Sequence, residues 1–408
     1  MITTNHTLIV LTDSFPYGLK ETFLENEVPF LAEAFDVVHL FPLHGEGSFR
    51  PQASNVVVHS PFLSFNPKNQ KRLFMAGLFN RSPLGFALKE WIAKSVYKHP
   101  LQWRVWAAAL LVFRASVANQ KRMAELRALL SEHTVVYSYW SDKLALLIPE
   151  LKIEHESFKS VVRFHRTDLY EAFKGGYIPF RSILLPKVDH AVFISNDGKR
   201  YLETKYRSLI RHSHLFRLGV ADHGVNPANA AQMFHLVSCS YMVPVKRIPL
   251  LMDALKLLHL PVRWTHIGSG PLYQSILKNA ASLPDYIQTE WLGEKSNSEV
   301  LAYYAATPVD LFINVSESEG VPVSIMEALS FGIPVMATNA GGTGEIVDEQ
   351  VGTLLPVDIS PSDLAKAIRQ FMEQPDKTTL RLNARKRWQE RCDAESNFRA
   401  FATFLLSV

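Results

Sequence analysis

The feature that most constrains the fold is an alternation of short β-branched runs with amphipathic stretches, which occurs twice along the chain. Such alternation is typical of parallel sheets whose strands are joined by helices. A polar stretch at 222–231 interrupts it. Because 408 residues exceed one ordinary domain, the sequence predicts two doubly wound α/β domains with a ligand cleft between them.

The pattern also predicts where the elements lie. Strands are expected in the first half at 7–12, 35–41, 134–137, 160–164, 190–194 and 214–218, and in the second half at 233–237, 262–267, 286–291, 309–314, 333–338 and 352–355. Helices are expected at 247–258, 298–305 and 361–373. The predicted domains are 1–225 for acceptor binding and 226–385 for donor binding, followed by a C-terminal helix at 386–408, for which a return to the first domain is one arrangement.

Composition excludes several classes of protein. Two cysteines, Cys239 and Cys392, cannot form a disulfide framework, which fits a reducing compartment. The longest apolar run, at 105–113, has nine residues and is too short to span a bilayer. The N-terminus lacks the basic start of a signal peptide. Asp-x-Asp, His-Glu-x-x-His and Cys-x-x-Cys are absent, so we expect no metal site and no cofactor.

The net charge of +4 conceals an uneven distribution. Residues 66–124 contain eleven Lys/Arg and one acid, Glu90, and therefore carry +10. This segment also contains eight aromatic residues. One interpretation is a set of solvated helix faces with buried aromatics. The other is a basic amphipathic surface that meets anionic lipid or a lipid-linked substrate. No nucleic-acid motif accompanies the charge, so no nucleic-acid partner is expected.

The most informative segment is 312–345, in which Glu319 and Glu327 stand eight residues apart. A strand is expected to end near Asn314, and Pro322 suits the first turn of the following helix. Free amides at a helix start attract an anion such as a diphosphate, and carboxylates beside it would bind hydroxyl pairs. The structural alternative makes Glu319 a capping residue and Glu327 an exposed helical one.

The surrounding residues favour the functional interpretation. The acid pair, the Gly-Val-Pro loop at 320–322, the Phe-Gly-Ile-Pro turn at 331–334 and the Gly-Gly at 341–342 resemble the E-x7-E signature of family 4 retaining glycosyltransferases. That family has the GT-B fold of two Rossmann-like domains facing a central cleft, and the likeness is to its bacterial exopolysaccharide and O-antigen members. The resemblance implies that Glu327 holds the donor ribose and Glu319 contacts the transferred sugar. It places the backbone of Gly320, Val321, Pro322 and Val323 against sugar and phosphates.

The resemblance also assigns basic and glycine residues to the donor side. Lys246 corresponds to the family lysine that neutralises the diphosphate, while Tyr241 stands where the family has an arginine. Arg247 is our hypothesis for its replacement. The loops expected to shape the nucleotide site contain Gly268, Gly270, Gly293, Glu294, Gly341 and Gly342, for which simple turns are the alternative.

In the first half, His165 follows a predicted strand and matches a family histidine that contacts the transferring sugar. A structural histidine is the alternative. Gly18 belongs to a loop that approaches the donor phosphates in the family. The acceptor-side candidates are Lys20, Glu21, Tyr139, Trp140, Arg166 and Asp168.

The resemblance implies a metal-independent hexosyltransferase that uses a UDP- or GDP-sugar and retains the anomeric configuration. Its acceptor would be a glycan or a polyprenyl-diphosphate-linked intermediate of cell-surface polysaccharide synthesis, such as lipopolysaccharide or exopolysaccharide. The expected location is cytoplasmic, with peripheral attachment to the inner face of the membrane as one arrangement. Two alternatives remain open: a GT-B-fold sugar-nucleotide epimerase, and a non-catalytic module that senses a nucleotide sugar, which the missing arginine keeps in play.

Overall fold

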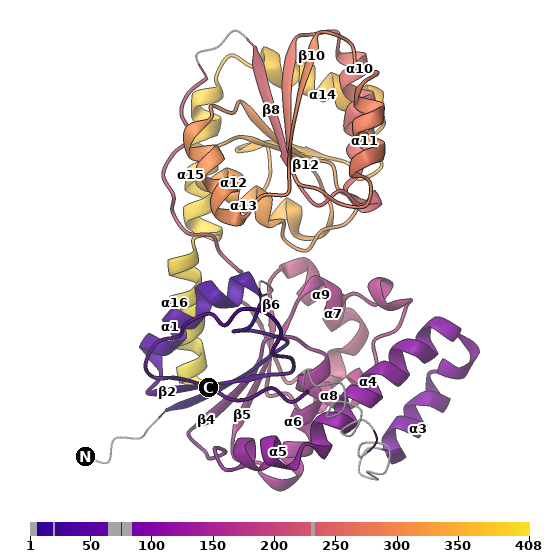
Figure 1. Ribbon diagram of the computed structural model, residues 1–408, viewed down its shortest axis with the longest axis vertical. Helices are drawn as coiled ribbons and strands as arrows, with labels where there is room; N and C mark the ends of the chain where they lie inside the picture. The colour runs from indigo at the N-terminus through magenta and orange to yellow at the C-terminus, as the bar shows by residue number, and fades with distance from the viewer. Residues whose placement is uncertain (1–5, 19–20, 64–74, 76–83, 230–232) are drawn as a thin grey trace. The chain divides into compact units, whose positions relative to one another are not determined.

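The computed structural model describes residues 6–18, 21–63, 75, 84–229 and 233–408 (Figure 1). It divides into two compact units. Unit 1 comprises Met1–Phe216 and Phe398–Val408, and unit 2 comprises Arg217–Asn397. The division at 216/217 lies nine residues before the boundary expected from sequence, and 221–229 form no helix or strand.

The described residues of unit 1 form a seven-stranded parallel sheet in the order β3-β2-β1-β4-β5-β6-β7. The strands are β1 Thr7–Thr12, β2 Val37–Pro42, β3 Val56–Val58, β4 Thr134–Ser138, β5 Lys159–Phe164, β6 His190–Phe193 and β7 His212–Leu215. Sequence analysis missed β3 and placed β7 at 214–218. Both are edge strands, in which partial exposure weakens the apolar pattern.

Helices cover both faces of this sheet. On one face, α1 (Thr22–Ala34) and the end of α16 (Ala394–Ser407) pack on β1 through Val28 and Phe401. Figure 1 shows these two helices side by side, and the rings of Phe30 and Phe398 lie 5.9 Å apart. The other face is covered by α3 Leu84–Ala93, α4 Pro100–Ala118, α5 Gln120–Arg127, α6 Leu147–Glu154, α7 Arg166–Leu169, α8 Arg181–Leu184 and α9 Asn196–Tyr206. The basic segment is thus helical over much of 84–124, and the rest of it, apart from Met75, lies outside the described residues.

The described residues of unit 2 form a six-stranded parallel sheet in the order β10-β9-β8-β11-β12-β13. Its strands are β8 Phe234–Cys239, β9 Val262–Ile267, β10 Ile287–Gly293, β11 Leu311–Asn314, β12 Val335–Thr338 and β13 Gly352–Leu355. Its helices are α10 Ile248–Leu258, α11 Tyr273–Ala280, α12 Asn297–Ala306, α13 Val323–Ser330, α14 Pro361–Glu373 and α15 Lys377–Arg391. Two doubly wound parallel sheets, as predicted, are therefore confirmed.

Strand order fixes where ligands bind in such sheets. The order reverses between β1 and β4 in unit 1 and between β8 and β11 in unit 2. Loops that leave neighbouring strands at such a point diverge to opposite faces and open a crevice beyond the carboxyl ends. Of the residues singled out from the sequence, Glu21 follows β1 and Trp140 follows β4 in unit 1, while Lys246 follows β8 and Glu319 follows β11 in unit 2.

Candidate functional site

The loops after β8 and β11 bring together the principal donor-side candidates of unit 2. Lys246 ends a short 3-10 helix after β8, and Glu319 lies in the loop after β11. The Lys246 Nζ is 2.5 Å from the Glu319 Oε1, and the Asn314 Nδ2 donates to the same oxygen at 3.3 Å. The Glu319 side chain is only 8% exposed. A cation and a carboxylate predicted to act on donor phosphate and sugar are thus in direct contact.

Glu327 lies in the middle of α13. The structural alternative in the sequence analysis made Glu327 an exposed helical residue, but every residue from Ile325 to Ser330 is buried because α13 packs against β11, β12 and α15. Pro322 is the N-cap of α13, with φ −68° and ψ 120°, and stands just before the helix instead of in its first turn.

Glu327 is 5% exposed, and its carboxylate accepts a hydrogen bond from the Asn297 Nδ2 at 2.5 Å. Burial raises its pKa to about 7, and the Asn297 bond opposes that rise. Asn297, the first residue of α12, was not predicted from the sequence. An asparagine at a helix start is usually a local cap, and only the fold shows that its amide reaches α13.

Arg247 is held by the backbone. It has a left-handed conformation with φ 49° at the start of α10. Its Nε donates to the Val315 carbonyl at 2.7 Å and its Nη1 to the Val357 carbonyl at 2.6 Å. The guanidinium thus connects the loops after β11 and β13. That Arg247 replaces the arginine that the family has at position 241 stays a prediction. Tyr241 is 60% exposed.

Glycines allow the loops around Lys246 and Glu319 to approach closely. Gly268 has φ 138°, and a Cβ there would lie 2.0 Å from the Ser240 carbonyl oxygen. Gly341 has φ 56°, and a Cβ there would lie 2.0 Å from the Glu319 carbonyl oxygen. Side chains at these positions would displace the site's backbone. A Cβ at Gly270 would likewise meet the backbone of Met242.

Backbone hydrogen bonds hold the other predicted glycines of unit 2. The Gly342 N–H donates to the Gly320 carbonyl at 2.6 Å, and the Gly293 carbonyl accepts from the Gly268 N–H at 2.8 Å. Glu294, which follows Gly293, is exposed.

In unit 1, the loop after β1 is organised by Glu21. One Glu21 oxygen accepts from the Asp13 N–H at 2.9 Å and the Trp140 Nε1 at 2.7 Å. The other accepts from the Ser14 N–H at 2.7 Å and the Phe15 N–H at 2.6 Å. This carboxylate therefore fixes the loop after β1 and ties it to the loop after β4. Its acceptor role stays a prediction.

Three further predicted residues of unit 1 are close in sequence to Glu21 or to His165. Gly18 has φ 68° and donates its N–H to the Ser48 carbonyl at 2.9 Å. Lys20 lies outside the described residues. Arg166 stacks its guanidinium carbon 4.3 Å from the centre of the Phe173 ring.

His165 follows β5 and is buried against two aromatic side chains. Its ring lies 4.6 Å from that of Tyr139 and 4.5 Å from that of Trp140. Burial lowers its pKa to about 3, with nearby Arg163 adding to the effect, so the imidazole is neutral at ordinary pH. Within the described part of the chain its Nε2 has no hydrogen-bond partner. A neutral ring with one open nitrogen suits the predicted sugar contact.

Asp168 closes the turn that carries His165. Its carboxylate accepts from the His165 N–H at 2.7 Å and the Ser141 N–H at 2.6 Å. Burial raises its pKa to about 7, and the neighbouring Asp142 adds to the rise. These contacts position the loops after β4 and β5, and its acceptor role stays a prediction.

Two searches of the described residues were negative. They contain no group of three or more His, Cys, Asp or Glu side chains arranged to hold a metal ion. None of the helices they form is long and apolar enough to cross a membrane.

Comparisons with known proteins bear on the family and on the fold. Residues 230–391 match the family model described as "Glycosyl transferases group 1". An uncharacterized glycosyltransferase of Methanocaldococcus jannaschii is 27% identical over 238 residues, which cover 57% of this chain and 62% of the relative. The chain thus spans less than two thirds of that relative's length.

Solved structures resemble nearly the whole chain. The similarity to Anabaena HepE in complex with UDP spans 98% of this chain and 100% of the HepE chain, with TM-score 0.65 and 17% identity. The lipopolysaccharide outer core galactosyltransferase WaaB covers 98% and 99%, with TM-score 0.66 and 15% identity. The chain therefore has the GT-B fold of glycosyltransferases, and its second unit carries the match to the group 1 glycosyl transferases.

Proposed function

We propose that this chain transfers a sugar from a UDP- or GDP-sugar to a hydroxyl acceptor with retention of configuration, as a family 4 enzyme that needs no metal. The observation that carries the proposal is the contact between Lys246 and Glu319 at the β8/β11 switch point. Solved structures of the similar HepE with UDP and with UDP-glucose support a nucleotide-sugar donor.

Each donor-side residue has a chemical task in this proposal. The Lys246 ammonium neutralises the diphosphate, whose charge grows as the sugar leaves. Glu319 accepts a sugar hydroxyl, and Glu327 accepts the ribose diol. The departing phosphate oxygen takes the acceptor's proton on the same face of the sugar, so Glu319 positions the substrate and forms no covalent bond.

Unit 1 binds the acceptor, which we propose to be a glycan or a polyprenyl-diphosphate-linked intermediate of cell-surface polysaccharide synthesis. The open Nε2 of His165 supports a contact with the transferring sugar. The similarity to WaaB, named as a lipopolysaccharide outer core galactosyltransferase, is consistent with such an acceptor.

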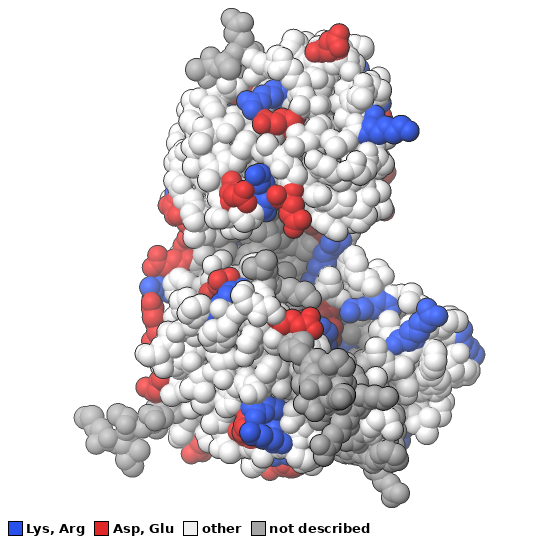
Figure 2. All heavy atoms as spheres, in the orientation of Figure 1, with Lys and Arg blue, Asp and Glu red and all other residues white. Residues whose placement is uncertain are grey.

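The basic segment supports a further partner, the anionic inner face of the cytoplasmic membrane. Its aromatic residues divide between the two interpretations of the sequence: Trp91 and Trp106 pack together with ring centres 4.6 Å apart, whereas Tyr97 is 54% and Trp103 50% exposed. Among residues 87–124, whose side chains are described, the exposed large apolar side chains are Leu88, Ile92, Tyr97, Leu101 and Trp103, and the exposed basic ones beside them are Lys89, Lys94, Lys98 and Arg104. Figure 2 shows several basic side chains over α3 and α4. Glu90 is buried and turned inward, so it does not offset this charge at the surface.

Release of nucleoside diphosphate tests the transfer. With a UDP- or GDP-sugar and a lipid-linked oligosaccharide, we expect release that depends on the acceptor and disappears in Glu319→Ala and Lys246→Ala. Epimerised donor formed without acceptor would contradict the proposal. So would donor binding without turnover in every acceptor mixture.

Vesicle sedimentation tests the membrane partner. We expect the chain to sediment with phosphatidylglycerol vesicles and not with phosphatidylcholine vesicles, and Lys89→Glu with Lys98→Glu to weaken sedimentation. Glu46→Lys is a matched control in the same unit, since Glu46 is exposed and lies outside the basic segment. Equal sedimentation with both lipids would contradict this part of the proposal.

A further inference from the structure

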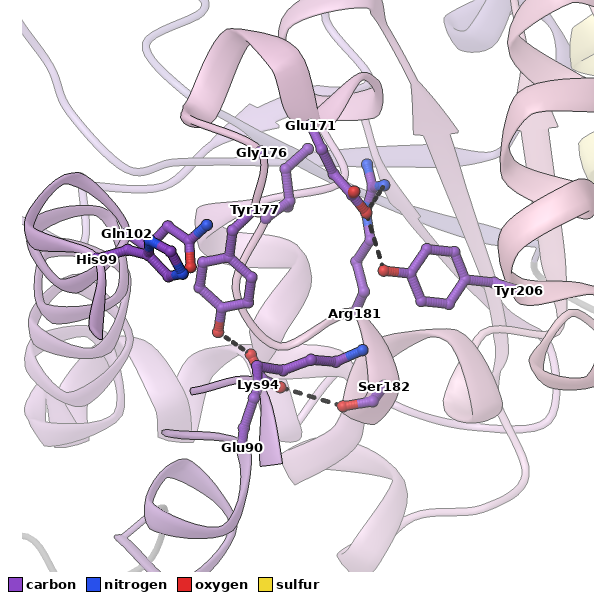
Figure 3. A pocket seen from close by; sticks show the side chains of 11 residues that line it. Glu90, Lys94, His99, Gln102, Glu171, Gly176, Tyr177, Arg181, Ser182 and Tyr206 are labelled. Atoms are coloured by element: carbon purple, nitrogen blue, oxygen red, sulfur yellow. Dashed lines mark hydrogen bonds and ion pairs between the residues drawn. The ribbon is translucent and has the colours of Figure 1, made fainter. Parts of the chain in front are cut away.

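Unit 1 contains a polar cavity of about 180 Å³ that none of the residues discussed for sugar transfer lines (Figure 3). It lies between the basic segment and the stretch from the 3-10 helix Glu171–Lys174 to α8, with the end of α9 as a further wall. The lining side chains that carry charge or hydrogen-bonding groups are Glu90, Lys94, His99, Gln102, Glu171, Tyr177, Arg181, Ser182 and Tyr206.

The first observation is a buried cation with open donors. Arg181 is 3% exposed, and its Nη2 donates to the carbonyls of Asp168 at 2.7 Å and Leu169 at 2.5 Å. Its Nε and Nη1 have no hydrogen-bond partner among the described residues. Arg181 belongs to the wall of the cavity. Buried guanidinium donors are normally paired, so two open ones on a residue that lines a cavity favour an acceptor supplied by a ligand.

The nearest acid does not satisfy this cation. The Glu171 Oε1 is 3.7 Å from the Arg181 Nη1, beyond hydrogen-bond distance. The Glu171 carboxylate instead accepts from the Lys205 Nζ at 2.7 Å and the Tyr206 hydroxyl at 2.9 Å. Figure 3 shows the Arg181 guanidinium beside Glu171 at one side of the cavity.

A second cation lies across the cavity. Lys94 is exposed, and its ammonium has no acidic partner within 4 Å in the described part of the chain. In Figure 3 its side chain extends over Glu90 toward Ser182. Lys94 and Arg181 line the cavity together with Glu90 and Glu171, and the Glu171 charge is offset by Lys205, which lies outside the lining.

The remaining wall suits hydroxyl groups. Glu90 is 6% exposed and accepts from the Tyr177 hydroxyl, the Phe180 N–H at 2.7 Å and the Ser182 hydroxyl at 3.1 Å, so these neutral donors fix its position. Gln102 donates its amide to the Gly175 carbonyl at 3.3 Å and retains its amide oxygen as an acceptor. Carboxylate, amide and phenol groups beside cations are the combination that binds a hydroxylated anion.

We propose that this cavity binds a phosphate carried on a hydroxylated carbon skeleton, that is, a sugar phosphate or polyol phosphate, with Arg181 and Lys94 on the phosphate and Gln102 and Tyr206 on the hydroxyls. The same chemistry is present in a free sugar phosphate and in a lipid head group such as phosphatidylinositol. The site does not depend on the proposed sugar transfer.

Calorimetric titration of the full chain without any nucleotide sugar tests the site. The probes are glucose 1-phosphate, glucose, inorganic phosphate, and vesicles of phosphatidylcholine with and without phosphatidylinositol. We expect glucose 1-phosphate or the phosphatidylinositol vesicles to bind, and glucose not to bind. Binding of glucose 1-phosphate identifies a free ligand. Binding of the phosphatidylinositol vesicles that exceeds binding of vesicles with the same fraction of phosphatidylglycerol identifies a lipid head group, because the basic segment is proposed to bind both anionic lipids.

Variants locate the binding. Lys94→Ala is expected to raise the dissociation constant about tenfold, and Arg181→Lys to raise it at least as much, since each removes charge-assisted hydrogen bonds. Lys159→Ala, an exposed lysine of unit 1 outside both the cavity and the basic segment, is the matched control and is expected to leave it unchanged. Because Lys94 is exposed, its variant should fold even where Arg181→Lys does not. The site is refuted if no probe binds, if Lys94→Ala binds as the wild type does, or if Lys246→Ala abolishes the binding.

Discussion

The two units place acidic residues at equivalent points of similar sheets but use them differently. At the β1/β4 switch point of unit 1, the Glu21 carboxylate accepts five hydrogen bonds from the protein, three of them from backbone N–H groups. At the β8/β11 switch point of unit 2, Glu319 contacts the side chains of Lys246 and Asn314, and Glu327 contacts that of Asn297. The acids of unit 2 therefore retain more capacity to accept bonds from a ligand.

Under the proposed sugar transfer, this difference separates a scaffold in unit 1 from a reactive site in unit 2. A carboxylate saturated by backbone donors holds a loop, and its loss should lower stability. A carboxylate paired mainly with a lysine can exchange that partner for substrate, and its loss should lower turnover. Variants that change stability without changing activity, or activity without changing stability, test whether the acids of the two units differ in this way.

The largest effect is expected at Glu319. Glu319→Gln keeps the shape of the side chain but removes the charge that faces Lys246 and the sugar, so kcat should fall about 100-fold or more. Steady-state release of nucleoside diphosphate measures this. Glu317→Gln, two residues earlier and exposed, is the control and should retain wild-type turnover. Wild-type turnover in Glu319→Gln would remove Glu319 from the site.

The next effect is expected at Glu21 and concerns stability. Glu21→Gln replaces one of two accepting oxygens by an amide donor, so backbone N–H groups after β1 lose their acceptor. The free energy of unfolding of unit 1 should fall by about 2 kcal/mol, as measured by denaturant titration. Glu25→Gln, which breaks only the partly exposed Arg50 pair, should cost about 1 kcal/mol or less. Equal stability with a raised acceptor KM would instead make Glu21 a ligand residue.

Glu327 predicts opposite pH effects on binding and on stability. Its pKa is raised by burial from 4.5 to about 7, so only the form present above that pH is fully ionised to accept a ribose diol. Donor affinity should rise about tenfold between pH 6 and pH 8, as followed by calorimetry. Its contribution to the free energy of unfolding is fully present below pH 4.5 and is lost as the pH rises through about 7. Glu327→Gln should remove both dependences, and an unchanged profile would contradict this role.

The smallest effect is expected from Trp140→Phe. This change removes one of the five donors to Glu21 and keeps most of the ring, so it should cost about 1 kcal/mol of stability. Combined with Glu21→Gln it should add little, because both variants remove the same contact. Full additivity in denaturant titration would show that Trp140 and Glu21 act independently.

Local patterns were the part of this molecule that could be predicted from sequence. Strand periodicity located β1, β9 and β13 to the residue, because a polar residue, a glycine or a proline follows each of these strands. The sequence around the two acids placed Glu319 in the loop after a strand and Glu327 in the helix that follows. That arrangement depends only on a strand, a loop and a helix that are contiguous in the chain.

Contacts between distant segments could not be predicted. Glu21 meets Trp140 across 119 residues, and Glu90 meets the Phe180 N–H across 90 residues. Neither acid has a neighbour in sequence that indicates its partner. The burial of Glu327 was also missed, because helical periodicity shows the most apolar face and does not show that α15 covers another.

Donor binding by a variant of each unit tests directly whether the donor-binding residues lie in unit 2. A thermal-shift screen with uridine, guanosine and adenosine diphosphate sugars first identifies the donor, since ligands raise apparent stability. Calorimetry of that donor with Lys246→Ala should then show a dissociation constant raised about tenfold or more, while Glu21→Gln remains within about twofold of the wild type. Full affinity in Lys246→Ala together with lost affinity in Glu21→Gln would contradict the assignment of the reactive site to unit 2.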